Sequence, residues 1–257
     1  MKKVDCKGYA QQILDEVKAS KPRKRLWIIS MGDNPASKAY IKGKLKDCEY
    51  CGITAEHLRP TSVQSLIQYI RCGNNLPYVG GMIVQLPLPD GISENRFIEE
   101  IAPEKDVDGF GIKSRFKPCT PEGIVFLLQK ELGALEGKSA LIIGKGKLVG
   151  LPLSQMLLQE GCTVTIAHSR TKNLDSFLSS GYDIIVSAVG KAKLVDLQKC
   201  KADIVVDVGI NYDDNGKMCG DCFNFVADDD SDMRVTTVPG GVGLLTRAIL
   251  MRHMMEE

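Results

Sequence analysis

No stretch of the sequence approaches the roughly 20 consecutive apolar residues that a membrane-spanning helix needs. The 33 Lys and Arg residues nearly balance the 32 Asp and Glu residues, which leaves a formal net charge of +1. No strong field of one sign therefore favours nucleic acid or a membrane surface as a partner, and we expect neither. The 257 residues also contain no internal repeat and no low-complexity linker, so we expect an ordinary globular protein with one large or two small domains.

The amino-terminal residues 1–5 lead into polar residues, so no secretory signal peptide is predicted. Nine cysteines without such a signal favour reduced thiols in a cytoplasmic protein. Cys48 and Cys51, like Cys219 and Cys222, have the CxxC spacing of zinc and redox sites. Neither pair is accompanied by further ligands in a metal-site pattern, and on a helix such spacing only places two thiols on one face. We therefore predict no metal site, with buried or incidental thiols.

Short apolar runs alternate with stretches of helical periodicity in the first 118 residues. Strands are predicted at 26–30, 53–58 and 81–86, and helices at 5–19, at 37–51 with Ser37 as N-cap and Gly52 as closing residue, at 63–72 and after Ser93. This alternation is typical of α/β folds with a mostly parallel sheet.

The alternation continues in the second half of the chain. A helix with Pro121 at its first position is predicted to run to about residue 132 and to link two domains. Strands follow at 139–143, 163–167, 183–187 and 204–208, with helices at 151–159 and from about Gly243 onward. We therefore predict an α/β protein of two domains with a cleft between them. Residues 1–118 plus 244–257 form a substrate-binding catalytic domain, and residues 119–243 form a Rossmann-like, doubly wound nucleotide-binding domain.

A glycine-rich segment lies between the strand at 139–143 and the next helix. Gly144, Gly146 and Gly150 give the pattern GxGxxxG, which departs from the usual GxGxxG. A glycine turn at this place lets backbone N–H groups and the helix N-terminus approach a pyrophosphate. The glycines alone are a weak signal, because such turns also serve packing. The preceding strand and following helix strengthen it, so we predict dinucleotide binding.

The end of the next strand distinguishes the two nicotinamide cofactors. NAD-binding folds usually place a carboxylate there for the ribose 2′-hydroxyl. This chain has His168, Ser169 and Arg170 instead, and hydroxyls and a cation suit a 2′-phosphate. Lys145 could add a second positive charge. We therefore favour NADP and keep NAD as an alternative, since Arg170 could also point into solvent.

Four polar residues in the first half could meet in a second site. Tyr40 and Lys44 are four residues apart on a predicted helix and share a face. Such pairs are usually surface residues. Gln85, however, ends an apolar strand and Asp108 follows another element, and strand ends converge on the binding crevice of a doubly wound sheet. A lysine in an apolar site can act as an acid or base near neutral pH.

Blocks with the spacing of a known family follow one another along nearly the whole chain. They are GDNPAS at 32–37 with Tyr40 and Lys44, VQLPLP at 84–89, KDVDGF at 105–110, PCTPEG at 118–123, the glycine loop with Val149, Gly150 and Pro152, AHSRT at 167–171, DVGIN at 207–211, GDCFNF at 220–225 and VPGGVG at 238–243. In these blocks the chain resembles the bifunctional methylenetetrahydrofolate dehydrogenase/methenyltetrahydrofolate cyclohydrolase family.

The resemblance implies a role for each residue of the second site. Lys44 corresponds to the acid/base residue of the cyclohydrolase step, and Gln85 to its hydrogen-bonding partner. Tyr40 corresponds to the aromatic residue that stacks on the folate, and Asp108 to the carboxylate that binds the pterin-like ring. The turn with Pro239, Gly240 and Gly241 is implied to line the substrate pocket.

The resemblance also implies the cofactor site and the biological setting. The implied cofactor-binding residues are Gly144, Lys145, Gly146, Val149, Gly150, His168, Ser169, Arg170 and Ile210. The implied reactions are oxidation of 5,10-methylenetetrahydrofolate with NADP and hydrolysis of the product to 10-formyltetrahydrofolate. They belong to one-carbon metabolism, which serves purine, histidine and methionine biosynthesis. A cytoplasmic homodimer with a small-molecule folate substrate is expected.

Three departures from the family pattern keep alternatives open. Lys145-Gly146 replaces the usual Arg-Ser, which removes a hydroxyl and the bidentate geometry of arginine. Leu244-Leu245 replaces Pro-Met, and the segment Gly111–Lys117 is shorter than in relatives. A monofunctional cyclohydrolase or a folate-binding relative with weakened dehydrogenase activity is therefore an alternative. A Rossmann dehydrogenase for another small acid is a second one, against which Lys44, Gln85 and Asp108 argue.

Overall fold

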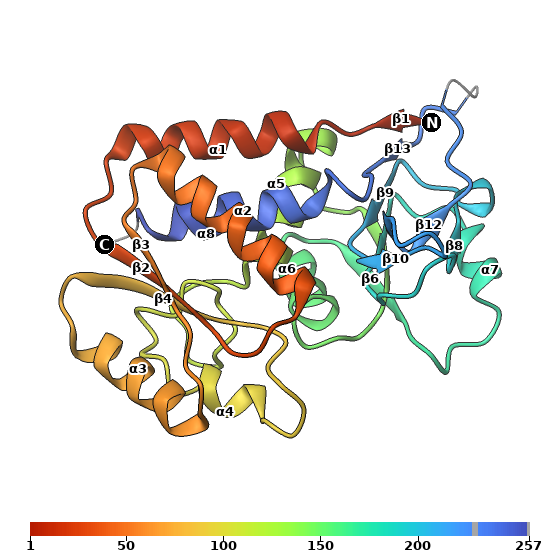
Figure 1. Cartoon of the computed structure of the whole chain (residues 1–257). Helices are drawn as coiled ribbons and strands as arrows, with labels where there is room; N and C mark the ends of the chain where they lie inside the picture. Colours follow the sequence, from red (N-terminus) through yellow and green to blue (C-terminus); the bar gives the residue numbers. More distant parts are fainter. Residues whose placement is uncertain (228–230, 256–257) are drawn as a thin grey trace. The chain divides into compact units, whose positions relative to one another are not determined.

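Parallel strands alternate with helices in the computed structural model, which describes residues 1–227 and 231–255 (Figure 1). The chain forms two compact units. Unit 1 comprises Met1–Ala10 and Thr120–Thr246, and unit 2 comprises Gln11–Cys119 and Arg247–Glu257. The helices α1 (Cys6–Ser20), α5 (Cys119–Leu132) and α8 (Val242–His253) each contribute residues to both units.

The first residues differ from the predicted domain limits, which place residues 1–118 together. Residues 1–10 lie in unit 1 because β1 (Lys2–Lys3) pairs in parallel with β13 (Arg234–Val235). Two-residue strands carry no readable periodicity, so this pairing could not be predicted from the sequence. The last two residues of the predicted range 244–257 lie outside the described residues.

Unit 2 is built on a three-stranded parallel sheet. Its further elements are β2 (Arg25–Ser30), α2 (Pro35–Cys51), β3 (Ala55–Leu58), α3 (Val63–Asn75), β4 (Val79–Gln85) and α4 (Glu94–Ile98). The strand order is β3-β2-β4, and an isolated parallel bridge between Met82 and Asp106 extends the sheet. Since β2 lies between its two successors, the carboxyl ends of β2 and β4 are adjacent, and Ser30 is the partner of Gln85.

The core of unit 2 joins this sheet to α3 and the α4 region. Its largest members are Trp27 and Ile29 on β2, Leu66 and Ile70 on α3, Met82 and Val84 on β4, and Phe97 and Ile101 near α4. Burial of such side chains is worth about 1.5–3 kcal/mol each. It fixes the sheet whose carboxyl ends carry the predicted site residues.

Unit 1 is built on a six-stranded parallel sheet in the order β1-β13-β9-β7-β5-β6. Its further elements are β5 (Ser139–Ile143), α6 (Gly150–Gln159), β6 (Thr163–Ala167), α7 (Leu174–Leu178), β7 (Ile184–Ser187), β8 (Val195–Asp196), η1 (Leu197–Lys199), β9 (Ile204–Asp207), β10 (Asn211–Tyr212), β11 (Met218–Cys219) and β12 (Cys222–Phe223). The strand order reverses at β5, whose successors lie on opposite sides. A doubly wound sheet binds its ligand at such a switch point.

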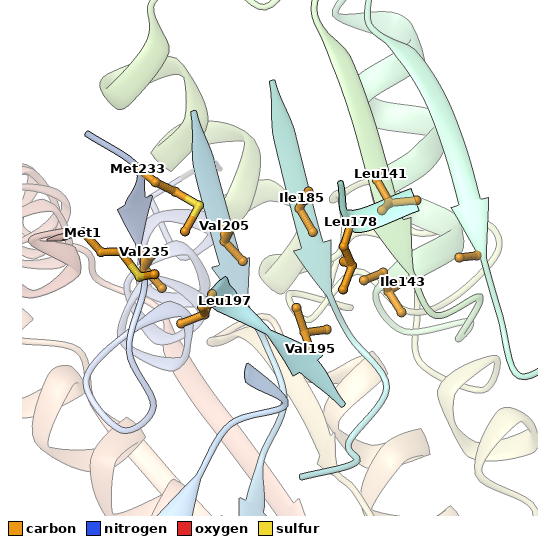
Figure 2. Packing of buried hydrophobic residues seen from close by; sticks show 11 residues of the cluster. Met1, Leu141, Ile143, Leu178, Ile185, Val195, Leu197, Val205, Met233 and Val235 are labelled. Carbon is orange, nitrogen blue, oxygen red and sulfur yellow. The ribbon is translucent and has the colours of Figure 1, made fainter. Parts of the chain in front are cut away.

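One face of this sheet packs in a continuous apolar cluster (Figure 2). The strands contribute Leu141, Ile143, Ile185, Val205 and Val235, and Leu178, Val195, Leu197, Met1 and Met233 cover them. The alternating positions of β5, β7 and β9 therefore point into one core, as the predicted βα winding requires.

Most predicted elements are confirmed, and two predicted helix starts are wrong. The strands at 139–143 and 163–167 agree to the residue. The helix predicted from Ser37 begins at Pro35, because Asn34 caps it and its Oδ1 accepts from Ser37 N at 3.0 Å. Pro121 is the third residue of α5 rather than the first, since that helix begins at Cys119.

Two further predicted caps have different outcomes. Ser93 does stand at the N-cap of α4, but its side chain makes no capping hydrogen bond. Gly52 closes α2 as predicted, with a φ of 74° that favours glycine. Within the described ranges, no helix is both long and apolar enough to cross a membrane.

Candidate active site

Helix α2 carries Tyr40 and Lys44 and buries one of its faces. Ile41, Lys44 and Cys48 lie on this face at helical spacing and are almost fully buried. The side chain of Lys44 is only 3% exposed. Lysine is almost never buried to this degree without a partner. The common interpretation of a Tyr/Lys helix pair as surface residues therefore does not hold here.

Lys44 faces a carboxylate and an aromatic ring. Its Nζ lies 3.8 Å from Oδ2 of Asp108, whose side chain is 11% exposed. The same Nζ lies 5.1 Å from the centroid of the Tyr40 ring. The structure thus brings three of the four predicted residues together. The 3.8 Å separation is too long for a direct hydrogen bond, so donor and acceptor capacity remains at both groups.

Gln85 ends β4 at the carboxyl edge of the sheet and is nine-tenths buried. Its Nε2 donates to the carbonyl of Leu86 at 2.9 Å. Its Oε1 is buried and has no hydrogen-bond partner among the described residues. An unsatisfied buried acceptor costs about 1–3 kcal/mol. This orphan oxygen indicates a place where a donor from a ligand or from Lys44 would bind.

The segment Lys105–Phe110 places Asp108 through its own side chains. Lys105 Nζ donates to the carbonyls of Gly73, Asn74 and Leu76 at 2.7–2.9 Å, which satisfies the last turn of α3. Burial lowers the pKa of Lys105.

The next residue of this segment, Asp106, also has a structural role. Its carboxylate accepts from Gly111 N at 2.7 Å, and burial raises its pKa. Lys105 is thus engaged with the end of α3, and Asp106 with the backbone of the turn that follows it. Asp108 is the other carboxylate of this segment, and it faces Lys44.

Two adjoining cavities open beside the carboxyl ends of β2 and β4. The first has a volume of about 250 Å³ and is lined by Ser30, Met31, Gly32, Asn34, Ser37, Lys38, Ile41, Lys42, Leu45, His57, Arg59, Gln85 and Pro87. The second, of about 500 Å³, shares Ser30, Met31, Gly32 and Arg59 with it. Of the predicted site residues, only Gln85 stands in these described linings.

Polar groups of the first cavity are already paired in part. Ser30 Oγ and His57 Nε2 are 2.7 Å apart. Partial burial and the charge of Arg59 lower the pKa of His57. Asp33 pairs with Lys38 and Arg59, each at 2.9 Å. The two described linings together therefore contain three cations, Lys38, Lys42 and Arg59, and one carboxylate, Asp33.

The glycine loop after β5 is shaped by close backbone contacts. A Cβ on Gly144, whose φ is 113°, would lie 2.4 Å from the carbonyl oxygen of Ala188. A Cβ on Gly150 would lie 2.0 Å from the carbonyl oxygen of Gly144. Glycine is required at both positions. Among the described residues beyond Gly146 and its chain neighbours, no atom lies within 4 Å of the position that a Cβ on Gly146 would take, so sterics do not require glycine there.

The N-terminus of α6 follows this loop. The cap residue Val149 offers no side-chain hydrogen bond to the first turn. Lys145 and Lys147 are exposed beside it. An uncapped N-terminus with nearby cations suits a phosphate group. The loop, the switch point and the helix start therefore coincide, as the predicted dinucleotide site requires.

The turn after β6 presents the residues predicted to distinguish NADP from NAD. His168 N donates to Thr171 Oγ1 at 2.9 Å, and Thr171 N donates to the carbonyl of His168 at 2.8 Å. Arg170 N donates to His168 Nδ1 at 3.1 Å. These bonds tie the turn together and leave the side chains of Ser169 and Arg170 exposed next to β5.

The remaining predicted residues follow β9 and β13. Ile210 is 56% exposed. Pro239 and Gly240 are exposed, and Gly240 has a φ of 93°. A Cβ on Gly241 would lie 2.4 Å from the carbonyl of Thr237. The backbone conformation of this turn therefore explains why glycine stands at 240 and 241. The predicted contact of Pro239, Gly240 and Gly241 with the substrate stays a prediction.

Two buried acids in unit 1 were missed by the sequence reasoning. Asp207 is 3% exposed and Asp221 is fully buried. Both lie in noted blocks, DVGIN and GDCFNF, but no role was predicted for them. A carboxylate directly after an apolar strand, as in the run Ile204–Asp207, was the available signal.

Three of the four cysteines with CxxC spacing lie where burial raises the pKa of the thiol. Cys48 and Cys51 are buried, and burial raises the pKa of each thiol to about 12. Burial likewise raises the pKa of Cys222. In the part of the chain that the structure describes, no group of three or more His, Cys, Asp or Glu residues is arranged to hold a metal ion.

These features define the class of protein. Unit 1 has the switch-point glycine loop of a nucleotide-binding fold, and unit 2 has a buried lysine facing a carboxylate. Such a combination is typical of an α/β enzyme that uses a dinucleotide.

Comparison with known proteins identifies the family. Residues 4–108 match the catalytic domain of tetrahydrofolate dehydrogenase/cyclohydrolase, and residues 118–257 match the NAD(P)-binding domain of the same family. The chain belongs to the tetrahydrofolate dehydrogenase/cyclohydrolase family. This confirms the resemblance found in the sequence blocks and the two-domain α/β architecture.

Individual relatives agree over the full length. The bifunctional protein FolD of Oceanobacillus iheyensis is 41% identical over 256 residues, which cover 95% of this chain and 89% of that protein. The crystal structure of the bifunctional FolD of Campylobacter jejuni has a TM-score of 0.90 and 37% identity, with 100% and 98% of the chains covered. The Trypanosoma brucei FolD complexed with NADP and an inhibitor has a TM-score of 0.88 and 28% identity, with 98% and 96% covered.

Proposed function

We propose that this chain oxidises 5,10-methylenetetrahydrofolate to 5,10-methenyltetrahydrofolate with NADP and then hydrolyses the product to 10-formyltetrahydrofolate. The observation that carries the proposal is the buried Lys44, which faces Asp108 and shares its helix face with Tyr40. Membership in a family named for both activities supports it.

Asp108 is proposed to bind the amino and ring N–H donors of the pterin-like ring. A carboxylate accepts two parallel N–H bonds, and such charge-assisted pairs are strong. At 3.8 Å from Lys44 Nζ, its oxygens are not consumed by that contact. Tyr40 is proposed to stack on the folate, since an offset ring contact adds about 0.5–1.5 kcal/mol beyond burial.

Lys44 is proposed to move protons in the hydrolytic step. Water adds to the electrophilic methenyl carbon and loses a proton, and the bond from that carbon to N5 breaks as N5 gains a proton. Lys44 Nζ sits in a nearly water-free place, where a positioned acid or base contributes about 10²–10⁴-fold. Gln85 Oε1, which is buried and has no partner among the residues that the structure describes, can accept from the ammonium and orient it.

The residues of unit 1 fit a dinucleotide. The glycine loop exposes backbone close to the start of α6, and the first turn of α6 has no side-chain cap. We propose that Gly144, Gly150 and this helix start hold the pyrophosphate, with Lys145 adding charge. Bound there, NADP would supply the acceptor for the hydride of the methylene carbon, so that oxidation of the folate would be balanced by reduction of the nicotinamide.

Ser169 and Arg170 are proposed to hold the 2′-phosphate of NADP. Both side chains are exposed at the carboxyl end of β6, next to the glycine-loop strand. The cofactor bound in the Trypanosoma brucei relative is NADP. Ile210 is proposed to contact the cofactor, and Pro239, Gly240 and Gly241 the substrate.

The cellular setting is also a proposal. We propose a cytoplasmic homodimer in one-carbon metabolism, on the strength of the family resemblance. Size-exclusion chromatography with light scattering tests the dimer, and a monomeric mass would contradict it.

A spectrophotometric assay tests the function. The purified protein is mixed with methylenetetrahydrofolate and NADP, and formation and hydrolysis of the methenyl product are followed. The proposal expects both steps. Hydrolysis of added methenyltetrahydrofolate without any oxidation would select the monofunctional cyclohydrolase, and no turnover in either assay would refute the proposal.

A further inference from the structure

Asp221 is a fully buried carboxylate that no step of the proposed reaction uses. It lies in the loop before β12 and accepts from five donors. Its Oδ2 accepts from Ser187 Oγ at 2.8 Å, Val189 N at 2.9 Å and Gly190 N at 3.3 Å, and its Oδ1 accepts from Lys191 N at 2.8 Å and Asn211 Nδ2 at 3.0 Å. A buried charge that is satisfied this fully holds its donors in one geometry.

Three of these donors are consecutive backbone N–H groups. They belong to Val189, Gly190 and Lys191, which follow β7 at its carboxyl end. A loop with exposed side chains normally moves, because few contacts restrain it. Here one carboxylate fixes the backbone while the side chains of Val189 and Lys191 stay exposed.

Asp207 extends the arrangement to the neighbouring strand. Its Oδ1 accepts from Gly209 N and Asp221 N, each at 3.0 Å, and its Oδ2 accepts from Cys222 N at 2.9 Å. A Cβ on Gly209 would lie 2.1 Å from Asp221 Oδ1. The two acids therefore couple the loops that follow β7 and β9.

The loop held by Asp221 touches the glycine loop. Ala188 N donates to the carbonyl of Ile143 at 2.8 Å, and the carbonyl of Ala188 lies against Gly144. β7 and β6 are the two neighbours of β5 in the sheet, on opposite sides of it, and the switch point lies at β5. The backbone of 188–191 therefore forms one side of the crevice in which the dinucleotide is proposed to bind.

Two exposed apolar side chains stand on these coupled loops. Val189 is 45% exposed and Ile210 is 56% exposed. They follow adjacent strands whose last residues, Ser187 and Asp207, are register partners. Apolar side chains that rigid backbone holds in the open at a crevice are suited to an aromatic ring of a ligand.

We propose that Asp221 is a positioning residue for the cofactor. It holds the backbone of residues 189–191 so that Val189, together with Ile210, forms an apolar wall for a ring of the dinucleotide. The inference rests on the proposed dinucleotide binding and adds Val189 to its contact residues. Asp221 acts through the loop and does not touch the cofactor.

Asp221→Asn tests the carboxylate with little change in shape. In wild type both oxygens of Asp221 accept from donors. In the variant, the amide NH2 group replaces one oxygen and faces those donors, so the loop loses some of the hydrogen bonds that hold it. We expect the Kd and the KM for NADP to rise about tenfold or more. The kcat at saturating NADP and the cofactor-independent hydrolysis of methenyltetrahydrofolate should stay within about twofold of wild type.

Val189→Ala tests whether the Val189 side chain contacts the cofactor, and it leaves Asp221 unchanged. Because Val189 is exposed, the variant should fold, and loss of its methyl groups should raise the Kd for NADP about fivefold. Asp183→Asn is the matched control. Asp183 also accepts from backbone and hydroxyl, namely Ser139 N and Oγ at 2.7 Å, but at the amino end of β5. The Asp183→Asn variant should leave the Kd for NADP unchanged, even if it lowers the Tm.

Titration calorimetry with NADP, thermal unfolding and both activity assays separate the outcomes. A raised Kd in Asp221→Asn and Val189→Ala, with hydrolysis intact, supports the inference. A Kd within about twofold of wild type in Val189→Ala, or in a folded Asp221→Asn, overturns it. If Asp221→Asn does not fold, Val189→Ala decides alone. Failure of the wild-type protein to bind NADP would instead refute the proposed function.

Discussion

The Nζ of Lys44 lies 3.8 Å from Oδ2 of Asp108, and the two side chains are only 3% and 11% exposed. A pair this buried is unlike a surface salt bridge, whose net contribution is about 0–1 kcal/mol. Removal of one partner leaves the other charge buried and unpaired, at a cost of about 3–5 kcal/mol. Because desolvation of two buried charges can exceed their mutual attraction, stability alone does not account for the pair, and a role in binding and proton transfer does.

Asp108→Asn should weaken folate binding and leave the cofactor site intact. The amide keeps one acceptor but loses the charge, and charge-assisted bonds are worth about 1.5–3 kcal/mol. We expect the KM for the folate substrate to rise about tenfold to a hundredfold. Steady-state kinetics measures it, and the Kd for NADP serves as the control. An unchanged folate KM in a folded variant would contradict the proposed role.

Gly43→Ala should destabilise unit 2. A Cβ on Gly43 would lie 1.7 Å from Nη1 of Arg247, whose Nε is 2.9 Å from Oδ2 of Asp47. Displacement of Arg247 would leave Asp47 without its cation in a site where burial already raises its pKa.

Denaturant unfolding should show a loss of about 1–3 kcal/mol in Gly43→Ala. The Arg247→Ala variant lacks the guanidinium with which the new methyl group would clash. Adding Gly43→Ala to that variant should therefore lower the unfolding free energy much less. Equal costs in the two backgrounds would show that Arg247 does not explain the glycine.

Arg170→Ala should reduce the preference for NADP over NAD. Its side chain is exposed at the carboxyl end of β6, where a 2′-phosphate is proposed to lie. We expect kcat/KM for NADP to fall about tenfold and that for NAD to change little, because only NADP carries the phosphate. Lys172→Ala, another exposed cation in the same turn region, is the control. Equal losses of kcat/KM with NADP and with NAD would contradict the proposal that Arg170 binds the 2′-phosphate.

Asp183 should give unit 1 a pH-dependent part of its stability. Hydrogen bonds from Ser139 Oγ and N lower the pKa of this carboxyl below its ordinary value of 3.8. A lowered pKa in the folded state stabilises that state above the unfolded pKa, and the gain is lost as the pH falls through the folded pKa. The difference in unfolding free energy between wild type and Asp183→Ala should be constant near neutrality and shrink in acid. A difference that grows in acid would refute this linkage.

Local pattern was sufficient for the short strands of the second half of the chain. The strands 139–143 and 163–167 were predicted to the residue because each is a short run of five residues with glycine close before it. Ser37 was wrong as a cap because the choice among Asn34, Pro35 and Ser37 depends on backbone angles that the sequence does not show. Long-range pairing such as β1 with β13 was beyond such reasoning.

The candidate site was predictable in part for a similar reason. The i, i+4 spacing of Tyr40 and Lys44 places them on one face but does not say that the face is buried; the matching family blocks supplied that expectation. Asp221 was missed because its partners are mostly backbone N–H groups, which no residue type reveals. The orphan Oε1 of Gln85 likewise exists only in three dimensions.

The most direct test of the central claim is the cyclohydrolase rate of Lys44→Met. Methionine keeps the length and apolar stem of lysine without its proton, and it leaves no buried cation. The claim predicts that hydrolysis of methenyltetrahydrofolate falls by about 10²-fold or more while the variant still folds and binds NADP. A folded Lys44→Met protein that hydrolyses methenyltetrahydrofolate at the wild-type rate would contradict it.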